Sequence, residues 1–355
     1  MISTYKKNFE IAIRCNSNKS KGFGNFRRCL ILYFYLKKKN KNSLFLIDND
    51  IEAKNILKKE NISFEIISNT HHKDESKQIH QILQKYDISK IVLDVRENGE
   101  SLAKKLQFEK LIIISIDDAW IKNVFSDIII NVTGIKKYSN YKIKYKYSKS
   151  FSGDEFFITD ENFCKHKKLL SSIHSKKNFN VTITMGGSDP NDLTQWILKI
   201  LLKNIQIHLT VILGPFYNKP NLLKNTVANY PNCKLVIAPK NIWNIFKNSD
   251  LVITNAGSTL FELSIQGIPN LSIIAFKHQK PYAEYFHKKG ATINLGFKST
   301  ISKTKLKNTV LQLLNNNNKR KTMCKLGPKI VDGKGTQRVC SIILETKNSK
   351  DKIKN

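Results

Sequence analysis

Residues 251–262 of the chain read Leu-Val-Ile-Thr-Asn-Ala-Gly-Ser-Thr-Leu-Phe-Glu. The first four residues are apolar or β-branched and predict a buried strand, and Leu-Phe-Glu begins a helical pattern. The loop between them, residues 255–259, is short and made of small residues, so the strand turns directly into the helix. A buried strand followed at once by a helix is typical of a parallel α/β sheet.

The loop Asn255-Ala256-Gly257-Ser258-Thr259 has two interpretations. Successive N–H groups at a Gly-Ser-Thr helix start, together with the helix dipole, suit a diphosphate, and Glu262 could then accept hydrogen bonds from ribose hydroxyls. The same residues, from Thr259 to Glu262, also form a capping box that does no more than begin a helix. The loop alone leaves both interpretations open.

The same alternation of apolar strands and amphipathic helices runs through the chain and predicts two Rossmann-like, doubly wound α/β domains. In such sheets ligands bind at the carboxyl ends of the strands, so we expect the two domains to face each other across a cleft. A length of 355 residues also favours two domains. Strands are expected at 9–14, 43–47, 64–67, 91–95, 111–116, 128–131, 181–185, 208–213, 234–237, 251–254 and 270–274.

The regular alternation is lost between about residues 138 and 177, which are rich in Tyr, Lys and Ser. We therefore expect the domain connection there. The predicted division is an N-terminal domain at 1–160, a linker at 161–178, a C-terminal domain at 179–345 and a polar tail at 346–355.

The chain is strongly basic, with 60 Lys and Arg against 28 Asp and Glu and a net charge of +32. Such a surplus favours anionic partners. Because only six of the basic residues are Arg and the lysines are spread along the chain, a general compositional bias explains the charge as well. No nucleic-acid-reading module is recognisable, so we expect no nucleic-acid partner.

The six cysteines form no Cys-x-x-Cys pair, which argues against a metal site and against a disulfide framework. Reduced thiols in the cytoplasm fit this pattern. No apolar run is long enough to span a bilayer, and no secretory signal follows the first lysines.

Two further loops combine glycine with small or polar residues at the start of a helix. The first is Gly22-Phe23-Gly24-Asn25, which precedes the first helix, and the second is Gly186-Gly187-Ser188-Asp189-Pro190. Glycine permits a tight turn and close approach to an anion, but a plain turn or helix cap explains either loop equally well.

Taken together and in order, these motifs resemble the UDP-amino-sugar hydrolases of pseudaminic acid biosynthesis and the related spore-coat polysaccharide proteins. Those proteins are grouped with the MurG-like glycosyltransferases of the GT-B fold. The similarity covers nearly the whole chain. It rests on residues 22–29, 116–119, 127–131, 186–190, 256–262, 267–269, 278–279 and 332–338.

The resemblance implies that the C-terminal domain binds the nucleotide. Gly257, Ser258 and Thr259 would then hold the diphosphate, and Glu262 would contact the ribose. Gly187 and Ser188 would complete the phosphate side, and Gln279 would lie near the sugar. No cofactor and no metal are implied.

The N-terminal domain would present water or a sugar or lipid-linked acceptor from the loops at Gly22–Asn25 and Asp94. Family hydrolases expel UDP as water attacks, with a histidine on the first glycine loop as the base. Here that position is Asn25, which cannot accept a proton at pH 7. A second departure follows Asp94, where Val95 and Arg96 stand in place of His and Tyr.

Other groups in the N-terminal domain could take over from the missing histidine. Asp94, Asp117 and Asp118 end predicted strands and are candidate bases, although an Asp in this place is also a common helix cap. Gly22, Gly24 and Asn25 would line the site. Arg27 or Arg28 would clamp a phosphate or an acidic sugar, and only one of the two can point into the cleft, because adjacent helical residues diverge. His71 and His72 lie in a polar loop, where we expect them to be solvated.

Three functions follow from the resemblance. The first is hydrolysis of a UDP-linked acetamido or diacetamido sugar to free sugar and UDP, in surface polysaccharide or nonulosonic acid biosynthesis. The second is transfer of the sugar from the same donor to an acceptor, and the third is nucleotide-sugar binding without catalysis. Asn25 weakens the case for hydrolysis more than the case for binding.

Overall fold

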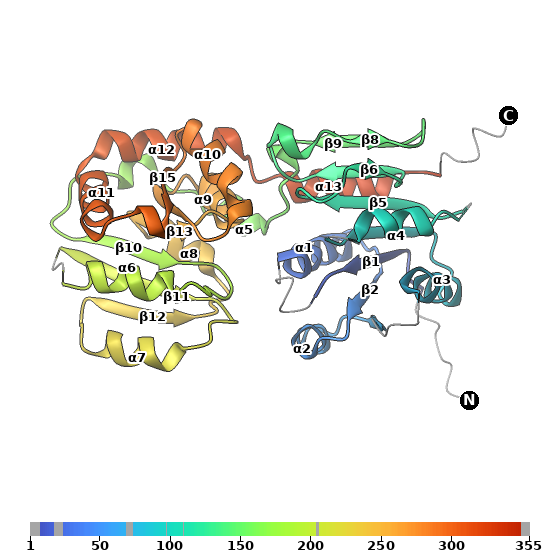
Figure 1. Cartoon of the computed structure of the whole chain (residues 1–355), viewed down its shortest axis with the longest axis horizontal. Coiled ribbons are helices and arrows are strands. Elements are labelled where there is room, and N and C mark those ends of the chain that lie inside the picture. Colours follow the sequence, from blue (N-terminus) through green and yellow to red (C-terminus); the bar gives the residue numbers. More distant parts are fainter. Residues whose placement is uncertain are drawn as a thin grey trace. The chain divides into compact units, whose positions relative to one another are not determined.

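The computed structural model describes residues 8–17, 24–68, 74–96, 98–108, 110–203 and 206–348. The chain divides into two compact units, and Figure 1 labels many of their helices and strands. Unit 1 comprises residues 1–159 and 334–355, and unit 2 comprises residues 160–333. Each unit is a doubly wound α/β domain, which confirms the predicted fold class.

The main sheet of unit 1 has the strand order β3-β2-β1-β4-β5-β7-β9, and every neighbouring pair is parallel. β6 and β8 form a separate two-stranded sheet. The strands are β1 (Ile11–Cys15), β2 (Ser43–Asp48), β3 (Phe64–Ile67), β4 (Lys90–Asp94), β5 (Ile112–Asp117), β6 (Asn123–Val124), β7 (Ile128–Asn131), β8 (Lys142–Ile143) and β9 (Lys149–Ser152).

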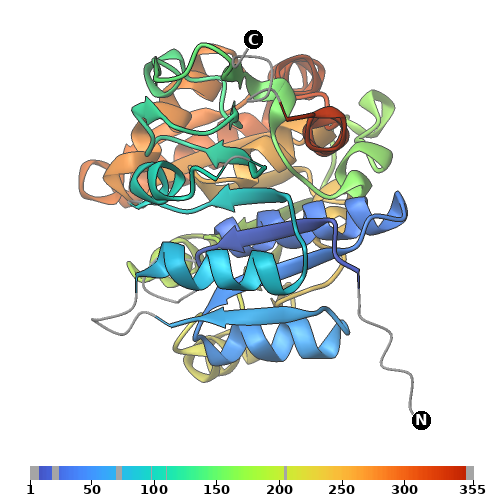
Figure 2. The ribbon, with the colours of Figure 1, turned by 90° about the vertical axis from the view of Figure 1, so that its right-hand side faces the viewer.

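Helices cover both faces of this sheet. One face packs on α1, α2 and α13, and the other packs on α3 and α4, which lie in front of the strands in Figure 2. Burial on both faces explains why the central strands are almost continuously apolar. The helices are α1 (Gly24–Lys38), α2 (Ile51–Lys59), α3 (Glu75–Lys85), α4 (Gly99–Lys105) and α13 (Gly335–Glu345), with short 3₁₀ turns η1 (Lys136–Tyr138) and η2 (Asp154–Phe156).

The sheet of unit 2 has the order β12-β11-β10-β13-β14-β15 and is also parallel throughout. Helices α6, α7 and α11 cover one face, and α9 packs against β13 and α12. The strands are β10 (Phe179–Thr184), β11 (Ile207–Leu213), β12 (Cys233–Ile237), β13 (Leu251–Asn255), β14 (Asn270–Ile274) and β15 (Ile293–Phe297). The helices are α5 (Glu161–Lys165), α6 (Leu193–Leu201), α7 (Pro220–Ala228), α8 (Ile242–Lys247), α9 (Thr259–Gln266), α10 (Lys280–Lys288), α11 (Lys303–Asn315) and α12 (Asn317–Ile330), with 3₁₀ turns η3 (Leu170–Ser172), η4 (Lys277–Gln279) and η5 (Lys298–Thr300).

In both sheets the chain starts in the middle, winds to one edge, and then returns to continue on the other side. The reversal falls between β1 and β4 in unit 1 and between β10 and β13 in unit 2. Loops on the two sides of such a reversal diverge and leave a crevice at the carboxyl ends of the strands. The fold therefore assigns one potential ligand edge to each unit.

Two strands extend the sheets beyond the prediction. β9 lies in the stretch where the sequence loses its regularity, because an edge strand with the sequence Lys-Ser-Phe-Ser lacks the apolar run of a buried strand. β15 contains Gly296 at a φ of +92° and pairs with β14 through a register shift.

The structure differs from the expected domain boundaries in the segment 161–178. This segment packs on unit 2 and is not a free connection. The Lys168 ammonium donates to the carbonyl oxygens of Lys247 (3.2 Å) and Ser249 (2.7 Å), and Lys176 pairs with the buried Asp250 at 2.8 Å. Short irregular segments of this kind carry no periodicity that would assign them to a core.

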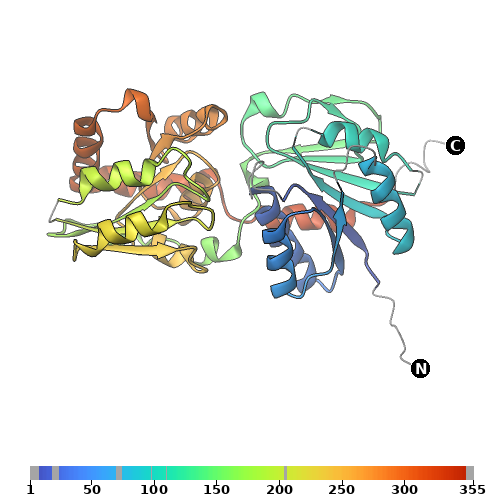
Figure 3. The ribbon, with the colours of Figure 1, turned by 60° about the horizontal axis from the view of Figure 1, so that its bottom comes forward.

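The second difference is helix α13, which the sequence places in the C-terminal domain. The chain returns to unit 1 at Lys334, and α13 packs there against α1 and η2 (Figure 3). The Thr336 hydroxyl donates to the carbonyl oxygen of Thr159 (2.7 Å) and accepts from its N–H (2.9 Å). Only long-range contacts decide where an amphipathic terminal helix docks, so local sequence could not predict this crossing.

Within the described residues, no helix combines the length and the apolar character needed to cross a lipid bilayer.

The close docking of α13 leads to a first prediction. A Cβ atom on Gly335 would collide with the backbone of Phe156 and Phe157, so we expect Gly335→Ala to destabilise unit 1 by about 1–3 kcal/mol. Gly99→Ala is the matched control, because Gly99 also begins a helix and its added Cβ would lie 3.8 Å from the nearest atoms. Urea unfolding curves measure both variants, and equal losses of stability would contradict the docking described here.

The anchoring of residues 161–178 leads to a second prediction. Burial lowers the pKa of the Lys168 ammonium to about 8, although the nearby Asp250 opposes this shift. The unfolded chain therefore binds more protons than the folded chain between about pH 8 and the usual lysine pKa, and stability rises with pH in that range. We expect the free energy of unfolding of unit 2 to increase by about 2 kcal/mol from pH 8 to pH 10.

Lys168→Met tests this assignment, because the variant has no proton to lose. Denaturant unfolding gives the free energy of unfolding of both proteins across the same pH range. The difference between the two slopes of this free energy against pH is the contribution of Lys168. Parallel slopes would show that Lys168 is not the responsible group.

Candidate functional site

In unit 2, the loops singled out by the sequence follow adjacent strands. β10, β13 and β14 are neighbours in the sheet, and because they are parallel their carboxyl ends lie at one edge. Gly187 and Ser188 follow β10, Gly257 and Ser258 follow β13, and Gln279 lies beyond β14. The structure therefore brings these predicted substrate-binding residues to the reversal point of one sheet.

The start of helix α9 keeps its N–H groups available. The N–H groups of Gly257, Ser258 and Thr259 donate to no acceptor within the described part of the chain. The N-cap residue is Ser258 and not Thr259, with which the predicted capping box begins, and the Ser258 side chain makes no capping bond. Three adjacent N–H groups at the positive end of a helix dipole are suited to an anion.

The surroundings of this helix strengthen its field. All eight residues of α9 are buried, while Ser258 at its start is exposed. A dipole embedded in protein is screened less than one in water, so the attraction of an anion to this end is larger.

Close packing fixes the two glycine loops against each other. The Asn255 amide nitrogen donates to the carbonyl oxygen of Met185 at 3.1 Å, and a Cβ on Gly186, whose φ is +80°, would lie 3.1 Å from that nitrogen. A Cβ on Gly214 would collide with the carbonyl oxygens of Gly186 and Gly187. The backbone of the loop after β10 is thus held by Asn255 of the loop after β13 and by Gly214, which follows β11.

Two further residues at this edge, Asp189 and Glu262, lie in different surroundings. The Asp189 carboxylate caps α6 by accepting from the N–H groups of Leu193 (3.0 Å) and Thr194 (2.8 Å), so it is a structural residue. Glu262 lies in the first turn of α9 with 4% of its surface exposed.

Gln279 is the residue that reaches Gly257. Its side-chain oxygen accepts from the N–H of Ala275 at 3.0 Å, and its side-chain nitrogen would lie 3.5 Å from a Cβ on Gly257. The amide nitrogen is therefore directed at the same glycine whose N–H is unused. His278 is exposed, and its ring stacks on Phe276 with a centroid distance of 5.5 Å.

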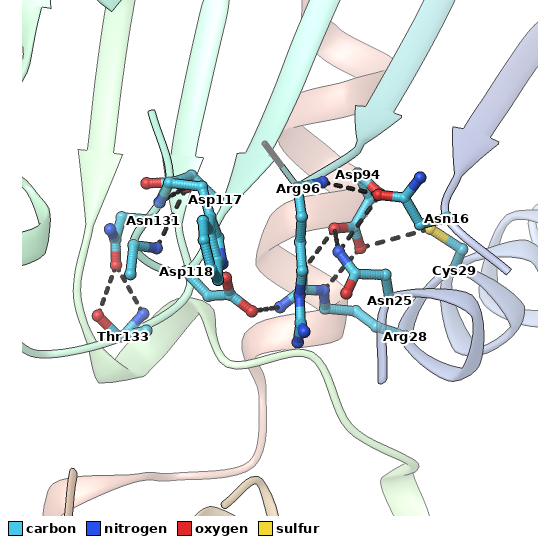
Figure 4. A network of polar contacts seen from close by, with 12 residues as sticks. Asn16, Asn25, Arg28, Cys29, Asp94, Arg96, Asp117, Asp118, Asn131 and Thr133 are labelled. Atoms are coloured by element: carbon cyan, nitrogen blue, oxygen red, sulfur yellow. Dashed lines mark hydrogen bonds and ion pairs between the residues drawn. The ribbon is translucent and has the colours of Figure 1, made fainter. Parts of the chain in front are cut away.

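In unit 1, a buried polar network occupies the reversal point (Figure 4). Asp94, at the end of β4, accepts from both Nε (2.7 Å) and Nη2 (2.5 Å) of Arg28 on α1. The Asn25 amide nitrogen donates to the same carboxylate at 2.5 Å, and the Cys29 thiol lies 3.5 Å from it. These contacts fill the hydrogen-bonding capacity of a carboxylate, which has about four lone-pair sites.

Arg28 links this network to the next strand. Its Nη1 donates to Asp118, which follows β5, at 3.2 Å. Burial lowers the pKa of the Arg28 guanidinium, but Asp94 and Asp118 outweigh burial and raise it well above its usual value. Of the two adjacent arginines, Arg28 is the one directed into the network, and the predicted Arg27 is exposed on α1.

Asp117, a predicted candidate base, holds a loop together. Its Oδ1 accepts from three backbone N–H groups, that of Trp120 at 2.8 Å being the shortest, and its Oδ2 accepts from the Tyr141 hydroxyl at 2.7 Å. Burial raises the pKa of the Asp117 carboxyl, and the hydrogen bonds from Trp120 and Tyr141 lower it in part. Both oxygens are occupied within the fold.

Some predicted site residues belong neither to the carboxyl edge of the unit 2 sheet nor to the polar network of unit 1. Gly22 and the pair His71 and His72 lie outside the described residues. Gly24 is the first residue of α1, is exposed, and has open space around it. Among the described residues, no three His, Cys, Asp or Glu side chains are arranged to hold a metal ion.

Sequence reasoning missed several residues that build these edges. Asn16 accepts from the N–H of Arg96 at 2.8 Å and so ties the loops after β1 and β4 together. The Arg96 guanidinium lies 5.7 Å from the ring centroid of Trp120. Gly214 carries no motif at all. The Asn25-x-x-Arg28 spacing was the available signal for the network, because residues three apart share a helix face.

Comparison with known proteins finds one family model that matches most of unit 2. Residues 173–330 match the glycosyltransferase family 28 C-terminal domain. This match contains the loop at residues 186–190, the loop at residues 255–259, and Gln279.

Three curated relatives resemble the chain as a whole. It is 30% identical over 290 residues to an uncharacterised protein of Methanocaldococcus jannaschii, covering 79% of this chain and 58% of the relative. It is 24% identical to the spore coat polysaccharide biosynthesis protein SpsG of Bacillus subtilis, covering 72% and 69%. A Helicobacter pylori protein named pseudaminic acid cytidylyltransferase and UDP-2,4-diacetamido-2,4,6-trideoxy-beta-L-altropyranose hydrolase is 26% identical, covering 85% and 50%.

The chain thus spans between about half and two thirds of the length of these relatives. Among solved structures, MurG of Acinetobacter baumannii superimposes with a TM-score of 0.70 at 13% identity, covering 95% of this chain and all of that one. The structural match confirms the GT-B type of fold, and the sequence matches confirm the family resemblance.

The network of unit 1 leads to a third prediction. Arg28→Leu should lower the free energy of unfolding by about 3–5 kcal/mol, because the Asp94 charge then stays buried without its partner. Adding Asp94→Asn removes that charge and should recover a large part of the loss. Arg27→Leu, the exposed neighbour on the same helix, should change stability by less than about 1 kcal/mol.

A double-mutant cycle measured by urea unfolding checks this prediction. Losses that simply add in the Arg28→Leu/Asp94→Asn protein would contradict the ion pair as described.

Proposed function

We propose that this chain, a relative of the UDP-amino-sugar hydrolases of pseudaminic acid biosynthesis and of the spore-coat polysaccharide proteins, is an enzyme that processes a UDP-linked amino sugar. Unit 2 binds the nucleotide sugar, and unit 1 supplies the group that receives the sugar. The bond that breaks joins the anomeric carbon to the diphosphate, and UDP leaves.

One observation carries the proposal for unit 2. The N–H groups of Gly257, Ser258 and Thr259 meet no acceptor among the described residues, at the start of a buried helix and within a segment that matches a glycosyltransferase family domain. A leaving diphosphate develops negative charge on its terminal oxygen, and fixed N–H dipoles stabilise that charge without reorganising. The exposed Gly187 and Ser188 complete the phosphate side of the site.

The neighbouring side chains extend the same assignment to the rest of the ligand. Glu262 contacts the ribose hydroxyls, and the Gln279 amide nitrogen, directed at Gly257, donates to the sugar or to a phosphate oxygen. Gly22, Gly24, Asn25, Arg27 and Asp94 line the sugar or acceptor side on unit 1.

The relatives and the site favour different outcomes of bond cleavage. The printed name of the Helicobacter pylori relative includes hydrolysis of a UDP-diacetamido sugar, and hydrolysis is the first candidate here. Transfer to an acceptor is the second, and Asn25 favours it, because an amide held by Asp94 cannot take a proton from water. We place the reaction in the cytoplasm, in surface polysaccharide or nonulosonic acid biosynthesis.

Ser258→Asp tests the donor site and separates it from simple helix capping. Aspartate is a good N-cap residue and its charge favours the helix dipole, so the fold should keep or gain stability. A carboxylate at this position repels a diphosphate, and we expect the affinity for UDP to fall at least about tenfold. Isothermal titration calorimetry with UDP measures the affinity, and thermal unfolding measures the stability.

Ser302→Asp is the control, because Ser302 caps helix α11 in the same unit by accepting from the N–H of Lys305 at 3.0 Å. This variant should bind UDP as the parent protein does. UDP affinity that survives Ser258→Asp unchanged would refute a diphosphate site at the start of α9.

A further inference from the structure

We propose that the acceptor presented by unit 1 is an oxygen nucleophile that is already ionised at neutral pH, namely a phosphate monoester, in place of water or an alcohol. The inference rests on the proposed function, because it takes the nucleotide sugar on unit 2 as the donor. It concerns the chemistry that the carboxyl edge of unit 1 can and cannot supply.

Asn25 cannot serve as the base for a neutral nucleophile. Water or an alcohol must lose a proton as it attacks the anomeric carbon, and a positioned base accepts that proton. The Asn25 nitrogen is turned toward Asp94 (2.5 Å), which leaves its Oδ1 buried and without a hydrogen-bond partner in the described chain. This oxygen can accept a hydrogen bond from a sugar hydroxyl or amide, but it cannot accept a proton.

The buried carboxylates beside Asn25 are occupied by hydrogen-bond donors of the fold. Asp94 is filled by Arg28, Asn25 and Cys29, and Asp117 by three backbone N–H groups and Tyr141. A carboxylate whose oxygens already accept hydrogen bonds from fixed donors has no site for the proton of a nucleophile.

The other carboxylates at this edge are also held by partners. At the end of β2, Asp48 accepts from Nη2 of Arg14 at 2.7 Å and from the N–H of Ser17 at 3.1 Å. Asp118 is held by Arg28 and keeps 20% of its side chain exposed. Because it is partly exposed, Asp118 is the carboxylate whose action as a base has to be tested by experiment.

Two arginine side chains bring positive charge to the same edge of unit 1. Arg27 is exposed in the first turn of α1, and Arg96 lies beside Trp120 in the loop after β4. Guanidinium groups bind phosphate through paired N–H donors.

The reaction balances without a base. One phosphate oxygen of the monoester dianion attacks the anomeric carbon and forms the new C–O bond. The bond from that carbon to UDP breaks, and its electron pair leaves on the terminal diphosphate oxygen. The products are a glycosyl phosphodiester with one negative charge and UDP with three, which equal the charges of the reactants, and no proton moves.

The test uses the full chain, UDP-2,4-diacetamido-2,4,6-trideoxy-β-L-altropyranose as donor and a matched pair of acceptors, citronellyl phosphate and citronellol. We expect UDP release to be at least about 100-fold faster with the phosphate than with the alcohol or with water alone, the range that a missing base predicts. Mass spectrometry should identify the glycosyl phosphodiester.

Equal or faster release with citronellol or water would overturn the inference. UDP binding to unit 2 without turnover on any acceptor would also overturn it, while the donor site stands. Absence of UDP binding would instead refute the proposed function itself, and the inference with it.

Variants identify the residue responsible for the preference. Asn25→His restores a base and should raise UDP release into water at least about tenfold, with UDP affinity and circular dichroism reporting that the protein is folded. Asn49→His is the matched control, because Asn49 is exposed just after β2 at the same edge, and it should gain no hydrolysis. Hydrolysis that stays unchanged in Asn25→His would count against the argument from Asn25.

Two variants exclude other bases. Asp118→Asn should slow transfer to citronellyl phosphate less than about tenfold, and a loss of 100-fold or more with disappearance of the acidic limb of the pH–rate profile would identify Asp118 as a base. The double variant His71→Ala/His72→Ala should keep the full rate, and its inactivity would overturn the inference.

Discussion

The ion pair between Arg28 and Asp94 is the constraint on which unit 1 depends. Asp94 is buried at the end of a central strand, where an unpaired carboxylate would cost several kcal/mol, and Arg28 on the first helix supplies the compensating charge. The pair joins β4 to α1 across the reversal point of the sheet. Asp94 also accepts a hydrogen bond from Asn25, one turn earlier on the same helix, so the same carboxylate positions both side chains.

The two units use the same topology in opposite ways. At the reversal point of unit 2, the N–H groups of Gly257, Ser258 and Thr259 are left unused, and the helix start carries no side-chain cap. At the reversal point of unit 1, Arg28, Asn25, Asp94 and Asp118 are paired with one another, and the Asn25 Oδ1 is buried without a hydrogen-bond partner among the described residues. An edge with spare N–H donors suits a charged leaving group, and the proposed acceptor edge of unit 1 instead combines a buried amide oxygen with exposed guanidinium charge.

The sequence predicts the central strands and the glycine loops because both leave local signals. Buried parallel strands are continuous apolar runs, and the loop at Asn255–Thr259 is compact and follows one directly. It does not predict that α13 returns to unit 1, that Asn255 holds Met185, or that Arg28 and not Arg27 reaches Asp94. These features depend on contacts between residues far apart in the chain, and an expected base such as Asp117 is recognised as structural only when its partners are known.

The replacement of histidine by Asn25 has a consequence that follows from the concentration of water. Any enzyme that holds a nucleotide sugar risks hydrolysing it, because water is always present and the donor is activated for substitution. A base beside the anomeric carbon speeds the attack of water as well as that of an alcohol, by about 10² to 10⁴. An acceptor that carries its own negative charge needs no such base, so removing the base slows only the wasteful reaction. In the proposed reaction, Asn25, held by Asp94 where it can orient but not deprotonate, would therefore separate transfer from hydrolysis by chemistry and not by exclusion of water.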